Sequence, residues 1–131
     1  MVNEAIQEDL KRAVKLFNRW QFQEAHEAFQ SLADDIDGRD KQFLEAFASL
    51  SAGFYRIWHK GGEANAMVTH IEKGIDMLRP YRRGAFGVDM TGLVDALTFC
   101  LEEAMRWRRG DEEIFNRDII PRIEFVPTPV D

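Results

Sequence analysis

The sequence predicts an all-α fold, a single orthogonal bundle of about five helices built from helical hairpins. Apolar residues recur at intervals of three and four along nearly the whole chain, whereas the alternation typical of a half-buried strand is scarce. Breaks rich in Gly, Pro and Asp divide this pattern into five segments. The length of 131 residues favours one domain over residues 1–131, in which about 111–131 form an extended tail that contains proline.

The first two segments predict a helical hairpin. They are joined by the short sequence NRWQ at 18–21, which favours a tight antiparallel turn. Their apolar positions follow one helical face in each segment. These positions are Ile6, Leu10, Ala13, Val14 and Phe17 in the first segment, and Phe22, Ala25, Phe29, Leu32, Ala33 and Ile36 in the second.

The third segment, about 41–59, predicts the central helix of the bundle. The sequence DDIDGRD precedes it, with Gly38 suited to ending the second helix and Asp40 to capping the third. Apolar residues cover more than half of the helix circumference, so neighbouring helices are expected on more than one side. The polar strip that remains is narrow and consists of Glu45, Ser49, Ala52 and Arg56.

The last two helices are predicted on either side of a long loop, PYRRGAFGVDMT. Pro80 stops the fourth segment, Asp89 or Thr91 is suited to capping the fifth, and Gly110 ends it. The tail is expected to be extended and to dock on its own fold, on a second subunit or on nothing. Its prolines are Pro121, Pro127 and Pro129.

The composition argues against several classes of protein. A content of 45% hydrophobic and 31% charged residues is typical of soluble globular proteins. The net charge of −6 repels a phosphate backbone, so nucleic-acid binding is not expected. No apolar run approaches the roughly 18 residues of a membrane span, and the first residues contain no apolar signal core. The single cysteine, Cys100, cannot form an intrachain disulfide, which favours a cytoplasmic location.

Two short basic clusters stand out against the negative charge. Each lies at a predicted helix C-terminus, where cations interact favourably with the helix macrodipole. A local basic patch is the alternative interpretation. The clusters are Arg79, Arg82 and Arg83, and Arg106, Arg108 and Arg109.

The sequence EAHE at 24–27 places His26 between two carboxylates, Glu24 and Glu27. The common helical zinc pattern needs a second ligand four residues away, and those positions carry Phe and Gln. The di-iron pattern Glu-x-x-His also fails, because Gln occupies the position three residues before His26. No metal and no cofactor is therefore expected.

Two interpretations of His26 remain open. On a helical wheel His26 lies at the edge of the apolar face, while Glu24 and Glu27 point away from the core. One interpretation is a boundary histidine with a single buried hydrogen bond beside two solvated carboxylates. The other is a binding or catalytic cluster of His26, Glu27 and Arg56 in a cleft that Asp89 also lines. The candidate site residues are thus Glu24, His26, Glu27, Arg56 and Asp89.

Several motifs occur in the order found in a small bacterial and archaeal family. An aromatic–Asn turn, Phe17-Asn18, precedes an aromatic-Gln-Glu-Ala-His-Glu helix start at 22–27. A run FLEAFASLSAGFY follows in the central helix, and Gly87-Val88-Asp89 precedes the last helix. Over roughly residues 10–101 the chain resembles the domain of unknown function 309. The resemblance implies an all-helical orthogonal bundle and no established activity.

The sequence favours a non-enzymatic interaction or small-ligand-binding module. The alternative is a small hydrolase-like enzyme that uses His26 with Glu27 or Glu24. Aromatic residues at helix ends and in loops either plug the edge of the core or form a patch for a protein partner or a second copy of the chain. These residues are Trp20, Phe86, Trp107 and Phe115.

Overall fold

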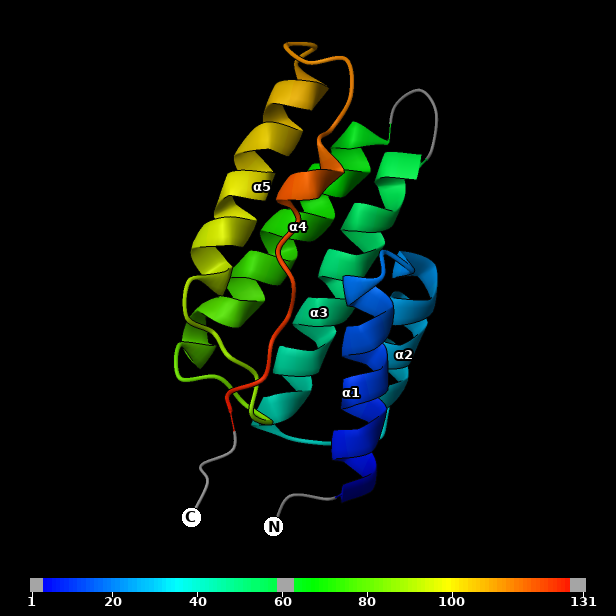
Figure 1. Ribbon diagram of the computed structural model, residues 1–131, viewed down its shortest axis with the longest axis vertical. Coiled ribbons are helices and arrows are strands. Elements are labelled where there is room, and N and C mark those ends of the chain that lie inside the picture. The colour runs from blue at the N-terminus through cyan, green and yellow to red at the C-terminus, as the bar shows by residue number, and fades with distance from the viewer. Residues whose placement is uncertain (1–3, 59–62, 128–131) are drawn as a thin grey trace.

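The computed structural model describes residues 4–58 and 63–127 and confirms the all-α prediction. Five α-helices make up the described part of the chain (Figure 1). All five run along the long axis of the molecule with different inclinations. The helices are α1 (Glu4–Asn18), α2 (Phe22–Asp34), α3 (Arg39–Tyr55), α4 (Ala64–Leu78) and α5 (Leu93–Arg108).

Three short 3₁₀ helices complete these elements. They are η1 (Arg56–Trp58), η2 (Arg79–Tyr81) and η3 (Arg117–Ile119). The central helix is therefore shorter than predicted, because α3 ends at Tyr55 and continues as η1; residue 59, its predicted end, lies outside the described residues.

The helix α3 is central, as its wide apolar surface predicted. It packs against α2 on one side and against α4 on the other, while α1 packs on α2 and α5 on α4. Gly74 of α4 lies so close to Leu50 of α3 that a Cβ at Gly74 would stand 2.6 Å from the Leu50 Cγ. Only a residue without a side chain allows this close contact, which brings α3 and α4 together.

The turn before α3 differs from the prediction. Gly38 does not end α2, which stops at Asp34; it directly precedes α3 as the N-cap residue, with a φ of 90°. Asp40 is the second residue of α3 and does not cap it. The left-handed conformation explains why glycine occupies position 38, since a side chain is strained at this φ.

The loop aromatics mostly close the core. Phe86 packs against Phe43 with 6.2 Å between ring centroids, and Phe115 is buried. Trp20 is the exception, because 37% of its surface remains exposed. The Arg117 guanidinium lies over its ring, 5.0 Å from the centroid. Trp107 is partly buried and packs against the core, so the interpretation of these side chains as core plugs is correct for Phe86, Trp107 and Phe115.

The tail docks on its own fold over the residues that the structure describes. It passes back along the bundle in front of α3, as the red segment of Figure 1 shows. The Val126 N–H donates to the Gly87 carbonyl at 2.8 Å, and an isolated antiparallel bridge joins Val88 and Phe125. None of the described helices is both long and apolar enough to cross a membrane.

Candidate functional site

His26 lies half-buried on α2 and faces α3. Its Nδ1 is 2.9 Å from the backbone carbonyl of Ala48. A carbonyl oxygen can only accept, so Nδ1 carries the proton and donates it to this bond. The first interpretation of His26, a boundary histidine with one buried hydrogen bond, therefore describes its contacts.

A small groove of about 130 Å³ surrounds His26 between α2, α3 and α4. We call it the His26 groove. It contains most of the polar strip that the sequence predicted on the central helix. Its lining residues are His26, Gln30, Glu45, Ser49, Ala52, His70, Lys73 and Met77.

The proposed cluster of His26, Glu27 and Arg56 does not form. Glu27 is exposed and accepts a hydrogen bond from Gln23 at 3.2 Å on its own helix. Arg56 pairs with Glu63 at 3.3 Å between a nitrogen and an oxygen atom. Neighbouring helical residues point about 100° apart, so burying His26 directs Glu27 to solvent. Glu24 is exposed as well.

His70 of α4 is the residue that the structure adds to the groove. Burial lowers the pKa of His70 most, and the positive charges of Arg56, His26 and Lys73 lower it further. The Ser49 hydroxyl donates to the His70 backbone carbonyl at 2.9 Å, so its proton is already used. A hint was present in the sequence, because His70 and Lys73 lie one turn apart on the same face of α4.

Metal binding finds no support in the groove. In residues 4–58 and 63–127, no three His, Cys, Asp or Glu side chains are placed to hold a metal ion. The hydrogen bonds of the groove are structural. His26 of α2 bonds to the Ala48 carbonyl of α3, and Ser49 of α3 donates to the His70 carbonyl of α4.

Asp89 lies away from the His26 groove, in the loop before α5. Its Oδ1 accepts a hydrogen bond from the Thr91 backbone N–H at 2.9 Å, and this bond lowers the Asp89 pKa. Its own backbone N–H donates to the Glu124 carbonyl. Neither Asp89 nor Thr91 caps α5, since Gly92 is the N-cap residue. Asp89 therefore shapes the loop that receives the tail.

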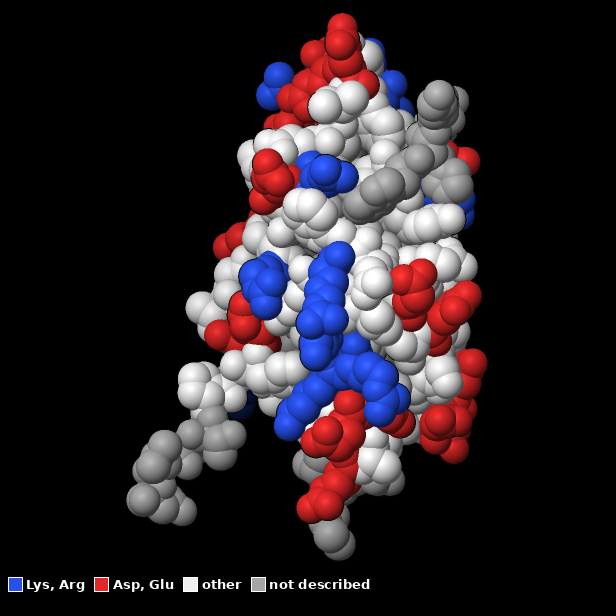
Figure 2. All heavy atoms as spheres, turned by 45° about the vertical axis from the view of Figure 1, so that its right-hand side comes forward, with Lys and Arg blue, Asp and Glu red and all other residues white. Residues whose placement is uncertain are grey.

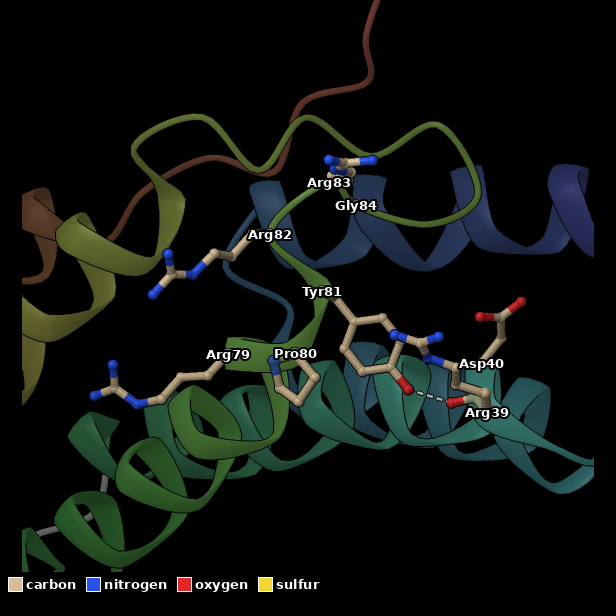
Figure 3. A pocket seen from close by; sticks show the side chains of 8 residues that line it. All are labelled: Arg39, Asp40, Arg79, Pro80, Tyr81, Arg82, Arg83 and Gly84. Atoms are coloured by element: carbon tan, nitrogen blue, oxygen red, sulfur yellow. Dashed lines mark hydrogen bonds between the residues drawn. The ribbon is translucent and has the colours of Figure 1, made fainter.

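A larger hollow lies at the end of the bundle where α3 begins and α4 ends. It measures about 500 Å³, and Figure 3 shows its side chains. We call it the arginine hollow. The sequence indicated three of its arginines as a basic cluster. It did not indicate the fourth, Arg39, which is some 40 residues earlier in the chain. Its lining residues are Arg39, Asp40, Arg79, Pro80, Tyr81, Arg82, Arg83 and Gly84.

Tyr81 forms the framework of the arginine hollow. Its hydroxyl donates to the Arg39 backbone carbonyl, and its ring packs on Phe43 with 5.2 Å between centroids. The Arg39 guanidinium lies 5.9 Å from the Tyr81 ring centroid. Gly84 turns the chain back with a φ of 78°, and a Cβ there would stand 2.5 Å from the Val88 carbonyl oxygen. These contacts hold the start of α3 against the turn after α4.

Most of the positive charge in the hollow is not neutralised. Arg79 pairs with Asp76 at 3.3 Å. Within the described part of the chain, Arg39, Arg82 and Arg83 have no carboxylate within ion-pair distance. Placement at a helix C-terminus accounts for the arginines that follow α4. It does not account for Arg39, a cation in the first turn of α3, where the macrodipole disfavours positive charge.

Comparison with known proteins gave no match, neither to a protein-family model nor to a characterised protein. The resemblance to the domain of unknown function 309 therefore stays a prediction.

Proposed function

We propose that this chain is a non-enzymatic module that binds a small anionic ligand in the arginine hollow. The observation that carries this proposal is that three guanidinium groups around one hollow have no carboxylate partner among the described residues, in a chain of net charge −6. Guanidinium forms bidentate, charge-assisted hydrogen bonds with phosphate and carboxylate groups. A hollow of about 500 Å³ also has the size of typical small-ligand sites.

A small ligand fits the charge distribution better than a polymer. Nucleic acid would extend beyond the hollow, and the net charge of −6 repels a polymer of phosphates. Figure 2 shows one face of the molecule, where a central group of Lys and Arg is bordered by Asp and Glu. On α1, Lys11 pairs with Glu8 and Arg12 with Asp9. These basic side chains of α1 are thus paired with acidic ones, unlike most arginines of the hollow.

The hydrolase alternative has less support in the geometry. A general base would need His26 and a carboxylate within reach of the same reacting atom. Glu24 and Glu27 point into solvent, and the proton of His26 Nδ1 is held by Ala48. The groove itself measures about 130 Å³, which is small for an organic substrate.

Isothermal titration calorimetry with inorganic pyrophosphate at low ionic strength tests the proposal. We expect saturable binding by the native chain and a loss of at least about 10-fold in affinity, or about 1.4 kcal/mol, in the double variant Arg82→Ala/Arg83→Ala. The control is Arg108→Ala/Arg109→Ala, which removes the same charge at the other end of the bundle (Figure 1). Absence of binding by the native chain, or an equal loss in both double variants, would refute the proposal.

A further inference from the structure

Three guanidinium groups of the arginine hollow lie on two sides of the Pro80–Tyr81 segment. In Figure 3 the side chains of Arg79 and Arg82 extend to one side of this segment, while Arg39 lies along Tyr81 on the other. Each side contains an arginine without a carboxylate partner among the described residues, Arg82 on one and Arg39 on the other. A ligand with one anionic group can engage only one of these sides at a time.

We infer that the ligand is a small organic bisphosphate, with two phosphate groups joined by a short carbon skeleton, one group on each side of Pro80–Tyr81. This inference rests on the proposed anion-binding function and names the chemical class of its ligand. Phosphate suits an arginine pair because its oxygens accept bidentate hydrogen bonds.

The size of the hollow supports two anionic groups. Its volume of about 500 Å³ exceeds what one inorganic phosphate fills and lies in the range of sites for organic molecules. Pro80 lies between the two groups of arginines and is exposed, so the skeleton of the ligand would cross its apolar ring.

The start of α3 strengthens the Arg39 side. Gly38 at the N-cap has no side chain to accept from the first backbone N–H groups of the helix, which lie next to Arg39; the Lys41 N–H donates to the Gly38 carbonyl at 3.3 Å. Such groups and the positive end of the helix dipole favour an anion. Asp40 is on the same side, and its negative charge repels an anion there. The Arg39 side is therefore the weaker of the two.

The separation between the two sides is set by Tyr81. Its hydroxyl donates to the Arg39 carbonyl and so ties the start of α3 to the turn that carries Arg82. A fixed separation lets the second phosphate bind without a further ordering cost, which is the origin of a bivalent gain in affinity.

The test compares fructose 1,6-bisphosphate with fructose 6-phosphate by titration calorimetry on the full chain. We expect the native chain to bind the bisphosphate at least about 10-fold more tightly than the monophosphate. Arg82→Ala and Arg39→Ala should each reduce this preference to about 2-fold or less, because either change leaves one anionic subsite. Arg39→Ala keeps the backbone carbonyl that Tyr81 uses, and a thermal melt of each variant verifies that it folds.

Two further variants sharpen the test. Asp40→Asn should tighten bisphosphate binding and leave the monophosphate nearly unchanged, whereas an unchanged bisphosphate affinity would contradict an anionic subsite beside Arg39. Tyr81→Phe should lower the preference for the bisphosphate without abolishing monophosphate binding. Equal affinity of the native chain for the two sugars overturns the bisphosphate inference while the anion-binding function stands. Failure to bind pyrophosphate and both sugars overturns both.

Discussion

Asn18 holds the backbone of Ile123 through two hydrogen bonds across 105 positions of sequence. The side-chain amide donates to the Ile123 carbonyl at 2.9 Å, and its oxygen accepts from the Ile123 N–H at 2.8 Å. The side chain thereby satisfies both polar groups of one tail residue, as a neighbouring strand would do. The loop before α5 also binds this tail. The Val126 N–H donates to the Gly87 carbonyl, and the Asp89 N–H donates to the Glu124 carbonyl.

This contact predicts that Asn18→Ala loosens the tail. Both backbone groups of Ile123, a buried residue, would lose their partner, so we expect a loss of about 1–3 kcal/mol in the free energy of unfolding. Urea denaturation measures this loss, and limited proteolysis should cleave the tail faster in the variant. Gln23→Ala, which removes an exposed side-chain hydrogen bond on α2, is the control and should change stability by less than about 0.5 kcal/mol. Equal effects of the two variants would contradict the role of Asn18.

The close contact of α3 and α4 predicts an unusual sign for Gly74→Ala. In a helix interior this substitution normally stabilises by up to about 1 kcal/mol. Here the added methyl group would stand 2.6 Å from the Leu50 Cγ and 3.1 Å from the Ala46 carbonyl oxygen. We therefore expect destabilisation by about 1–3 kcal/mol in thermal or urea unfolding. As a control, Thr69→Ala at an exposed position of the same helix should change the free energy of unfolding by less than about 0.5 kcal/mol. A stabilised Gly74→Ala variant would disprove the close approach of the two helices.

His70 predicts a loss of stability on acidification. Its pKa in the folded chain lies below the usual 6.5, so the unfolded chain takes up a proton first as the pH falls. Unfolding is then favoured below pH 6.5, and the slope disappears once the folded state is also protonated. Urea midpoints at about pH 8 and pH 5 should therefore differ less in His70→Gln than in the native chain. An identical pH dependence in both chains would remove His70 as the cause.

Cys100 is predicted to be unreactive in the folded chain. Burial, with a further contribution from Glu103, raises the pKa of the Cys100 thiol to about 12, and its Sγ contacts the Ile119 carbonyl. The thiolate is the reactive form, so a disulfide reagent near neutral pH should label native protein slowly and guanidinium-unfolded protein at once. Rapid labelling of the native chain would show that α5 and the segment at η3 open readily.

The two interpretations of His26 predict different mutational effects. His26→Ala removes the hydrogen bond to Ala48, so we expect it to lower the free energy of unfolding by about 1 kcal/mol. His26→Asn keeps a donor near the Nδ1 position and should recover part of this loss. Glu27→Ala should change the free energy of unfolding by less than about 0.5 kcal/mol, since Glu27 is exposed. Chemical denaturation of the three variants measures these free energies of unfolding and separates the two interpretations. A large effect of Glu27→Ala would revive a functional cluster at this position.

Sequence periodicity by itself determined the five helices, the central position of α3 and the direction in which His26 and Glu27 point. These features depend on helical spacing and on which side chains avoid water, and both are local properties of the chain. The polar strip on α3 was predicted for the same reason, and three of its four residues line the His26 groove. The helix ends were predicted less well, because Gly38 and the stop of α3 depend on how neighbouring helices meet.

Only the tertiary structure decided which distant residues share a site. Arg39 joins Arg79, Arg82 and Arg83 because Tyr81 fastens the start of α3 to the turn after α4. His70 lies in the same groove as His26 because α4 packs closely on α3, where Gly74 of α4 leaves room for Leu50 of α3. Such neighbours follow from the packing of one helix on another, which sums many weak contacts and leaves no short pattern in the chain. The sequence therefore determines each helix and its buried face, and the packing of the helices determines the arginine hollow.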